Sequence, residues 1–559
     1  MIRLEETSWS IPFYRPAPWT DLPLIHQSEH LFPYISYADT EAEPVPRAFR
    51  MLTLENDFLR AQVAPELGGR VYSLFDKRIG EEILFSNPVV KPVRILPIWA
   101  FISGGIEFNF PIAHSPTSIA EVGATMGQIG DYGFIRVGET EARTGMEWVV
   151  ELGLFESAPV LVQRTWLRNR TGRAHPWMMW TIGAVRSTER TEFVHPSDRV
   201  LVHDDHLVEV DWPGDGLNWD HHVEQMTALF WRRSVSPHFG AFHHDLGFGL
   251  MHWADPAKLP GKKVWTYGHG RHRRWGQATT SGAISYAELE SGPLLDQNEK
   301  PLFPNGVELR FEEFWIPVHA REACDRIDRP DVALPEIAEP WLGFRHSRWQ
   351  SEWDNFNRGT GPLPNSTVVT GMNLENALRA ELESGNARAA EPLALWLAFH
   401  DRPAEALALI ANSGNPAEQR IAGLILWKAL RQPQAAVAHL EAGPLDDPVA
   451  VVELDELYSA LGLHEKRARL LAGAPAHRRI IERRADLALA NGDPSTTIRL
   501  LSETVWPLEH QRYVRTELWK KAKAALGETG TEAPEFIGED NLARFGAYWS
   551  SAPEAKQIP

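Results

Sequence analysis

Two segments of the chain place carboxylates among aromatic residues in a pattern suited to sugar chemistry. The first is Gly104–Pro111, an apolar and aromatic run with a single carboxylate, followed by His114. Alternation along an extended strand turns Glu107 and Asn109 to the face opposite the Ile and Phe side chains. Because a sugar ring has hydroxyl edges and C–H faces, a polar pocket with aromatic walls would suit it. The alternative for this segment is a solvated edge strand.

The second segment is Trp265–Gln297, in which Tyr286, Glu288 and Glu290 recur every second residue. That spacing puts all three side chains on one face of a strand. Two carboxylates on one face repel each other and split their pKa values, which suits a reaction that needs one acid and one base. The alternative is a solvent-facing strand whose carboxylates pair with the arginines of residues 271–274.

We therefore predict that Glu107 and Glu288 are the catalytic residues. Of the two, Glu107 is expected to be the acid, because its apolar neighbours would desolvate it and raise its pKa. The remaining polar and aromatic residues of these segments, with one early arginine, are predicted to bind the substrate. These predicted contacts are Arg70, Asn109, His114, Trp265, His269, Trp275, Tyr286 and Glu290. No metal and no cofactor is predicted.

The composition limits the class of protein. With 559 residues the chain exceeds one ordinary core, so several domains are expected. The formal charge of −18 gives no indication of a nucleic-acid or anionic membrane partner and suits a neutral substrate. The single cysteine, Cys324, excludes an internal disulfide, and the first residues do not read as a signal peptide, so a cytoplasmic location is predicted.

The pattern of residues changes along the chain. Residues 45–324 read as short strands rich in β-branched and aromatic residues, separated by Gly, Pro, Asn and Asp, and this favours an all-β sandwich. Residues 1–44 are expected to pack on that domain. Seventeen of the 22 tryptophans and 17 of the 22 histidines precede residue 373, so the chemistry is expected in the β part. The predicted strands are Phe49–Thr53, Leu59–Ala64, Arg70–Phe75, Trp148–Leu154, Val160–Arg168, Trp177–Val185, Phe239–His252 and Val307–Pro317.

A helical pattern replaces the strands at residue 373. Leu374, Leu378 and Leu382 recur every fourth residue, with Asn373 as an N-cap, and similar short Ala- and Leu-rich segments follow as far as Ser495–Thr504. Short paired helices of this kind build an α-solenoid. The sequence therefore predicts a linker at 325–372 and a helical domain at 373–559, through which a homo-oligomer could form.

The chain also resembles a known family. In Asn56–Val71 a strand runs into a Pro-Glu-Leu-Gly-Gly-Arg turn, and this resembles the opening of galactose-mutarotase-like domains. Gly104–Pro111 and Tyr286–Gly292 more specifically resemble the DUF5107 family, a mutarotase-like β-supersandwich often followed by tetratricopeptide-type (TPR) helices. The resemblance covers about residues 45–320. It implies a carbohydrate-binding fold, and it places Glu288 in the late-strand region where a mutarotase has its base.

Three functions remain open from the sequence. A glycoside hydrolase, which needs two carboxylates flanking the scissile bond, is the first prediction, with a neutral glycoside or oligosaccharide as substrate. An aldose 1-epimerase, which needs one acid and one base at a free anomeric hydroxyl, is the second. A non-catalytic carbohydrate-binding or scaffold protein is the third.

Overall fold

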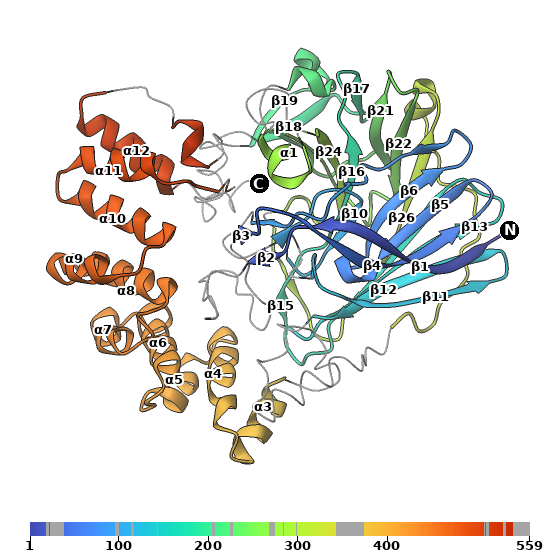
Figure 1. Cartoon of the computed structure of the whole chain (residues 1–559). Helices are drawn as coiled ribbons and strands as arrows, with labels where there is room; N and C mark the ends of the chain where they lie inside the picture. Colours follow the sequence, from blue (N-terminus) through green and yellow to red (C-terminus); the bar gives the residue numbers. More distant parts are fainter. Residues whose placement is uncertain are drawn as a thin grey trace.

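A computed structural model shows a β part followed by a helical part (Figure 1). It describes residues 1–17, 22, 39–94, 100–112, 114, 117–141, 144–203, 207–223, 227–267, 274–282, 284–297, 299–341, 374–507, 509, 514–528 and 533–539. This arrangement confirms the predicted β-supersandwich with a helical domain after it. The predicted N-cap Asn373 lies outside the described residues, as does 342–372 of the predicted linker.

The β part is built from two large antiparallel sheets. The first sheet has 12 strands in the order β1-β4-β5-β6-β10-β16-β24-β23-β20-β18-β19, with β7 paired to β6. Its strands are β1 (Arg3–Phe13), β4 (Val45–Glu55), β5 (Leu59–Ala64), β6 (Arg70–Asp76), β7 (Glu81–Glu82), β10 (Ile106–Asn109), β16 (Trp180–Arg186), β18 (Arg199–His203), β19 (Leu207–Asp211), β20 (Thr227–Trp231), β23 (Gly261–Thr266) and β24 (Tyr286–Gly292).

The second sheet has eight strands in the order β11-β12-β13-β14-β26-β22-β21-β17. They are β11 (Gly123–Ile129), β12 (Tyr132–Thr140), β13 (Glu147–Phe155), β14 (Leu161–Arg168), β17 (Thr191–Val194), β21 (His238–His243), β22 (Phe248–Ala254) and β26 (Glu308–Val318). The last strand in sequence, β26, therefore lies in the middle of its sheet, between β14 and β22. Three two-stranded pairs complete the part: β2 (Pro16–Ala17) with β3 (Asp39–Thr40), β8 (Val93–Arg94) with β9 (Ala100–Phe101), and β15 (His175–Pro176) with β25 (Leu302–Phe303).

One hydrophobic core lies between the two large sheets and contains side chains from both. Alternation decides which residues of the central strands enter it. On β10, Ile106 and Phe108 belong to this core. Phe108 pairs with Thr181 of β16, so the two side chains share a face. The Thr181 hydroxyl donates to Glu313 of the second sheet at 3.1 Å, so this face is turned towards the second sheet. Glu107 consequently lies on the face of the first sheet that is turned away from the second.

The helical part contains ten α-helices among the described residues, arranged as successive antiparallel pairs (Figure 1). Pro at the first turn of five helices and Asn or Asp caps on three of them fix where those helices begin. The helices are α3 (Leu374–Glu383), α4 (Ala390–Phe399), α5 (Pro403–Ile410), α6 (Pro416–Leu424), α7 (Pro433–Glu441), α8 (Pro448–Ala460), α9 (His464–Gly473), α10 (Arg478–Ala490), α11 (Pro494–Glu503) and α12 (Val514–Ala525).

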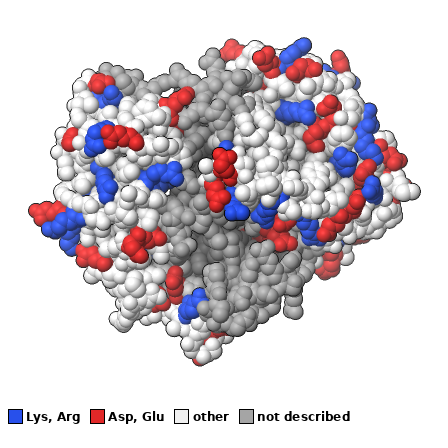
Figure 2. All heavy atoms as spheres, viewed as in Figure 1, with Lys and Arg blue, Asp and Glu red and all other residues white. Residues whose placement is uncertain are grey.

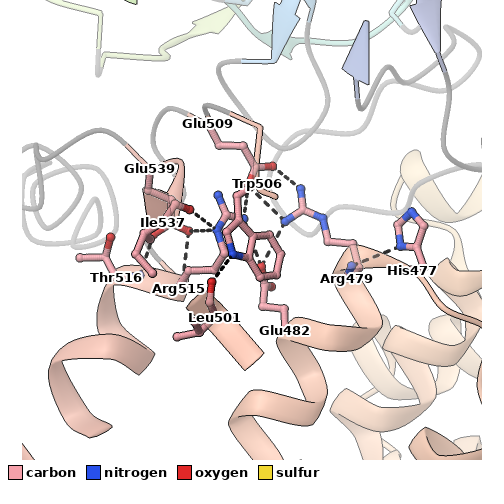
Figure 3. Close-up of polar contacts among 10 residues, drawn as sticks. All are labelled: His477, Arg479, Glu482, Leu501, Trp506, Glu509, Arg515, Thr516, Ile537 and Glu539. Carbon is pink, nitrogen blue, oxygen red and sulfur yellow. Dashed lines mark hydrogen bonds and ion pairs between the residues drawn. The ribbon is translucent and has the colours of Figure 1, made fainter. Parts of the chain in front are cut away.

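A buried ion network joins the last helices (Figure 3). Arg515 of α12 is paired with Glu482 of α10 and with Glu509, and its Nε donates to the Ile537 carbonyl at 2.8 Å. Glu539 accepts hydrogen bonds from the first backbone amides of α12, so it caps that helix. The network thus ties the segment after α12 to the helices before it.

Several details differ from the sequence predictions. The N-terminal segment supplies β1, which pairs with β4 along its whole length as an edge strand of the first sheet. Phe239–His252 was predicted as one strand and is a hairpin, because the sequence between β21 and β22 turns at Asp245–Gly247. The sandwich was predicted without helices, yet it holds the six-residue α1 (Arg274–Thr279).

The residues at the end of the β part, from Arg321 to Trp341, pack against the second sheet. Cys324 lies in the short helix Arg321–Asp325 and is fully buried, and burial raises the pKa of its thiol to about 12. Residues 326–341 run along the second sheet, where the Pro335 carbonyl accepts from Arg164 at 2.6 Å. The guanidinium of Arg168 lies 3.9 Å from the ring centre of Trp341.

Candidate functional site

The predicted site residues are brought together on one face of the 12-stranded sheet, on strands β6, β10, β16, β24 and β23. Glu107 on β10 is opposite Ile182 on β16, Ile182 is opposite Glu290 on β24, and Glu290 is opposite Lys263 on β23. Residues directly opposite each other share a face, and Glu288 shares it with Glu290 by alternation. We call the face that carries Glu107, Glu288, Glu290 and Lys263 the carboxylate face.

The sheet geometry sets the separation of the two predicted catalytic residues. Glu107 on β10 and Glu290 on β24 are separated by the single strand β16, and Glu288 lies two residues from Glu290 along β24. Ordinary strand spacings therefore place the Cα atoms of Glu107 and Glu288 about 12 Å apart. Side chains projecting from the same face can approach across such a gap and leave a space the width of a sugar ring. The two carboxyls also interact, because the charge of Glu107 contributes to raising the pKa of Glu288.

Glu107 is held as a carboxylate. It is buried, and it accepts a hydrogen bond from the Ser118 hydroxyl at 2.8 Å. Arg70 Nη2 lies 3.5 Å from its Oε1, and His114 Nδ1 lies 3.7 Å from its Oε2. Burial alone would raise the pKa of Glu107, but the charge of Arg70, aided by His114 and Ser118, outweighs burial and lowers it to about 2.

The surroundings of Glu288 act in the opposite direction and raise its pKa. It is equally buried, and the hydroxyl of Tyr267 lies 3.4 Å from its Oε1. Burial, followed by the charge of Glu290, raises the pKa of Glu288 well above its ordinary value, while Lys263 and Arg70 only partly offset this. Of the two carboxyls, Glu288 is therefore the one whose surroundings favour the protonated form.

The prediction of a raised pKa at Glu107 is therefore wrong, and it is Glu288 whose pKa is raised. Its apolar neighbours do bury Glu107, as expected. Arg70 on β6 also reaches the carboxyl of Glu107, because β6 pairs with β10, and the sequence alone does not show this pairing. An opposite charge at this distance favours the ionised form more strongly than burial disfavours it.

Aromatic rings line the carboxylate face. Trp265 is opposite Glu288 on β23, and Tyr286 lies two residues before Glu288 on β24. The ring centre of Tyr267 is 6.2 Å from that of Trp265 and 4.8 Å from that of Tyr286. Phe85 stacks on the other side of Tyr286 at 4.9 Å. Such rings offer apolar faces to the C–H groups of a sugar.

The other predicted contacts fall in different places. Asn109 is fully buried, two residues beyond Glu107 and on the same side of β10. His114 has a backbone φ of 52°, a strained conformation typical of functional sites, and its ring packs against Phe101 with centres 5.0 Å apart. Trp275 belongs to α1, but its side chain is not described, and His269 lies outside the described residues.

Sequence reasoning missed Lys263, Ser118 and Tyr267. Lys263 lies two residues before Trp265, so the same alternation that selected Tyr286 and Glu288 would have placed it on the carboxylate face. Ser118 had no such signal, because it comes from a loop. Within the described part of the chain, no group of three or more His, Cys, Asp and Glu side chains could hold a metal ion.

Comparison with known proteins identifies the family. The family model of DUF5107, described as a domain of unknown function, matches residues 26–318, more than half of the chain. The chain belongs to the DUF5107 family. A second family model, described as a C-terminal domain, matches residues 363–522. No helix in the described part of this family member is long and apolar enough to cross a membrane.

The chain is also similar to proteins of solved structure. A TPR-domain containing protein from Parabacteroides distasonis ATCC 8503 is 28% identical, with a TM-score of 0.88 over 97% of this chain and 98% of that chain. A galactose mutarotase-like protein from Lactobacillus casei ATCC 334 is 12% identical, with a TM-score of 0.36 over 48% of this chain and 100% of that chain. A galactose mutarotase related enzyme from Lactobacillus acidophilus is also 12% identical, with a TM-score of 0.35 over 48% of this chain and 98% of that chain.

Proposed function

We propose that this DUF5107 protein is a glycoside hydrolase that acts on a neutral glycoside or oligosaccharide. The observation that supports it is the pair of buried carboxyls on one face, where the pKa of Glu107 is lowered and the pKa of Glu288 is raised. Glycosidases need such a pair on the two sides of the scissile bond. A cytoplasmic location is part of the proposal.

In the proposed reaction Glu288 donates its proton to the glycosidic oxygen as the bond to the anomeric carbon breaks. Glu107 accepts a proton from a water molecule, whose oxygen attacks the anomeric carbon from the other side of the ring. Inverting glycosidases keep their carboxyls about 6.5–9.5 Å apart to admit that water, and the estimated Cα separation is compatible with this spacing. The products are a free sugar and the leaving alcohol. Glu107 then releases the proton it took from water to solvent, and Glu288 regains one from solvent.

The charges of the site favour a neutral substrate. Arg70 is paired with Glu107, and Lys263 is paired with Glu290, so each cation already has a carboxylate. A sugar carboxylate would have to displace one of them. On the molecular surface, acidic and basic side chains are interspersed over the face shown in Figure 2.

An aldose 1-epimerase is the second candidate, favoured by the position of His114 beside Glu107. A histidine and a carboxylate at one anomeric hydroxyl could exchange its proton without any attacking water. The two candidates are separated by assaying the purified protein against a panel of aryl glycosides and oligosaccharides, and against free sugars by polarimetry. Cleavage that Glu288→Gln loses on substrates with a poor leaving group supports the hydrolase, and faster α/β interconversion alone supports the epimerase. Neither activity, with sugar binding retained, would contradict both and favour a binding protein.

The pH dependence of hydrolysis follows from the two carboxyls. Activity requires Glu107 ionised, and its pKa of about 2 keeps it ionised well below the pH at which an ordinary carboxyl is protonated. Activity also requires Glu288 protonated, and its raised pKa means that the proton is lost only above the pH at which an ordinary carboxyl loses it. We therefore expect kcat/KM to stay level as the pH falls through the ordinary carboxyl range and to decline as the pH rises through the raised pKa of Glu288, since this profile reports the free enzyme. A fall between pH 6 and pH 4 without unfolding would contradict the assignment.

A further inference from the structure

Next to Glu288 on the carboxylate face is a closed group of three buried polar side chains. Lys263 Nζ lies 2.6 Å from Glu290 Oε1 and donates to Gln297 Oε1 at 2.7 Å, and Gln297 Nε2 in turn donates to Glu290 Oε2. Lys263 is 3% exposed and Glu290 1%. Lys263 and Gln297 therefore both contact Glu290, and Lys263 gives it a cationic partner.

The position of this group matters because two carboxyls of one strand lie side by side. Glu288 and Glu290 are buried, on the same face and two residues apart, which is about 7 Å along a strand. Two carboxyls at this distance in a buried site compete for one proton. Nothing in the strand itself decides which of them is protonated.

We propose that Lys263 is a positioning residue that leaves the shared proton to Glu288 by forming an ion pair with Glu290. The inference deepens the proposed function, because it explains how the acid of the reaction is kept ready. Lys263 also lies 4.5 Å from the ring centre of Trp265, which fixes its ammonium group beside Glu290 on the carboxylate face.

Two carboxyls and two cations act on the charge of Glu288. Glu290 and Glu107 favour its protonated form, whereas Lys263 and Arg70 favour its ionised form. Lys263 thus acts on Glu288 in two opposing ways, directly as a cation and indirectly by holding the charge of Glu290. While the ion pair is intact, the charges of Lys263 and Glu290 largely cancel at Glu288. Burial then favours the protonated form of Glu288. If Glu290 is neutralised, the uncompensated Lys263 should draw Glu288 into its ionised form.

The test measures the protonation of Glu288 in the full-length protein by infrared difference spectroscopy at pH 7. Subtracting the spectrum of Glu288→Gln from that of the parent isolates the carbonyl band of the protonated Glu288 carboxyl, which shifts in D₂O. We expect this band in the wild type, its loss in Glu290→Gln, and its return in the double variant Lys263→Met with Glu290→Gln, in which burial alone acts. The corresponding Glu288→Gln variant serves as the reference for each background.

A matched control is Lys262→Met, which removes an equally buried lysine whose side chain lies on the opposite face of β23. It should leave the band unchanged, because Lys262 does not act on Glu288. Retention of the band in a folded Glu290→Gln protein would overturn the proposal, and so would its continued absence in the folded double variant; circular dichroism verifies the fold in each. The measurement needs no substrate, so failure to find hydrolysis would not affect it.

Discussion

Replacing Glu288 with glutamine is expected to lower the hydrolysis rate of a glycoside with a poor leaving group by about 10²–10⁴-fold, the usual worth of general acid catalysis. Glutamine keeps the shape of the side chain but has no proton to give. The rate on an aryl glycoside with a good leaving group, which needs no protonation, should fall much less. Steady-state kinetics on both substrate types measures this difference.

Glu107→Gln provides the contrast. It removes the carboxylate that activates water, so both substrate types should be affected alike. The exposed Glu308 of β26 offers a control, and Glu308→Gln should leave both rates unchanged. Equal losses on both substrates for Glu288→Gln, or near-normal rates for both variants, would remove the acid–base assignment.

The largest stability effect is expected at Arg515. Its guanidinium is 1% exposed, pairs with Glu482 and Glu509, and lies 4.7 Å from the ring centre of Trp506 (Figure 3). Arg515→Met would remove one of the two arginines that pair with these buried carboxylates and leave them to Arg479. Breaking a buried pair costs about 3–5 kcal/mol, and we expect a loss towards the lower end of this range because Arg479 remains. Denaturant unfolding gives the change in the free energy of unfolding.

The loss should be local as well as large. Hydrogen exchange should speed up in α10 and α12, which the network joins, and change little in the β part. Arg499 of α11 is the matched control, since it forms an exposed pair with Glu503, and Arg499→Met should cost less than about 1 kcal/mol. An Arg515→Met protein with wild-type stability and exchange would show that the network does not hold the terminal helices.

The sequence was a good guide wherever a local pattern determines the structure. Alternation placed Glu107 on one face of β10, and the short Ala- and Leu-rich segments predicted most helices of the C-terminal part within a few residues. The helix α12 was not predicted, although Val514, Leu518 and Ala522 recur every fourth residue on it. That the helical part forms a homo-oligomer stays a prediction.

The protonation states could not be read from the sequence because they depend on pairings between distant strands. Arg70 reaches Glu107 only because β6 pairs with β10, and Lys263 reaches Glu290 only because β23 pairs with β24. Register of this kind is set by the whole core. Types and spacing of residues therefore identified the candidates, whereas the assignment of acid and base required the fold.

The central place of β26 has a consequence for synthesis of the chain. This strand, residues 308–318, is the last of the β part, yet both β14 and β22 pair with it. While the ribosome is still making the preceding residues, the facing edges of β14 and β22 have no partner, and unpaired strand edges invite association with other chains. Long-range pairings of this kind also form slowly. The helical part is made only after β26, so the β part can close before the neighbouring helices emerge.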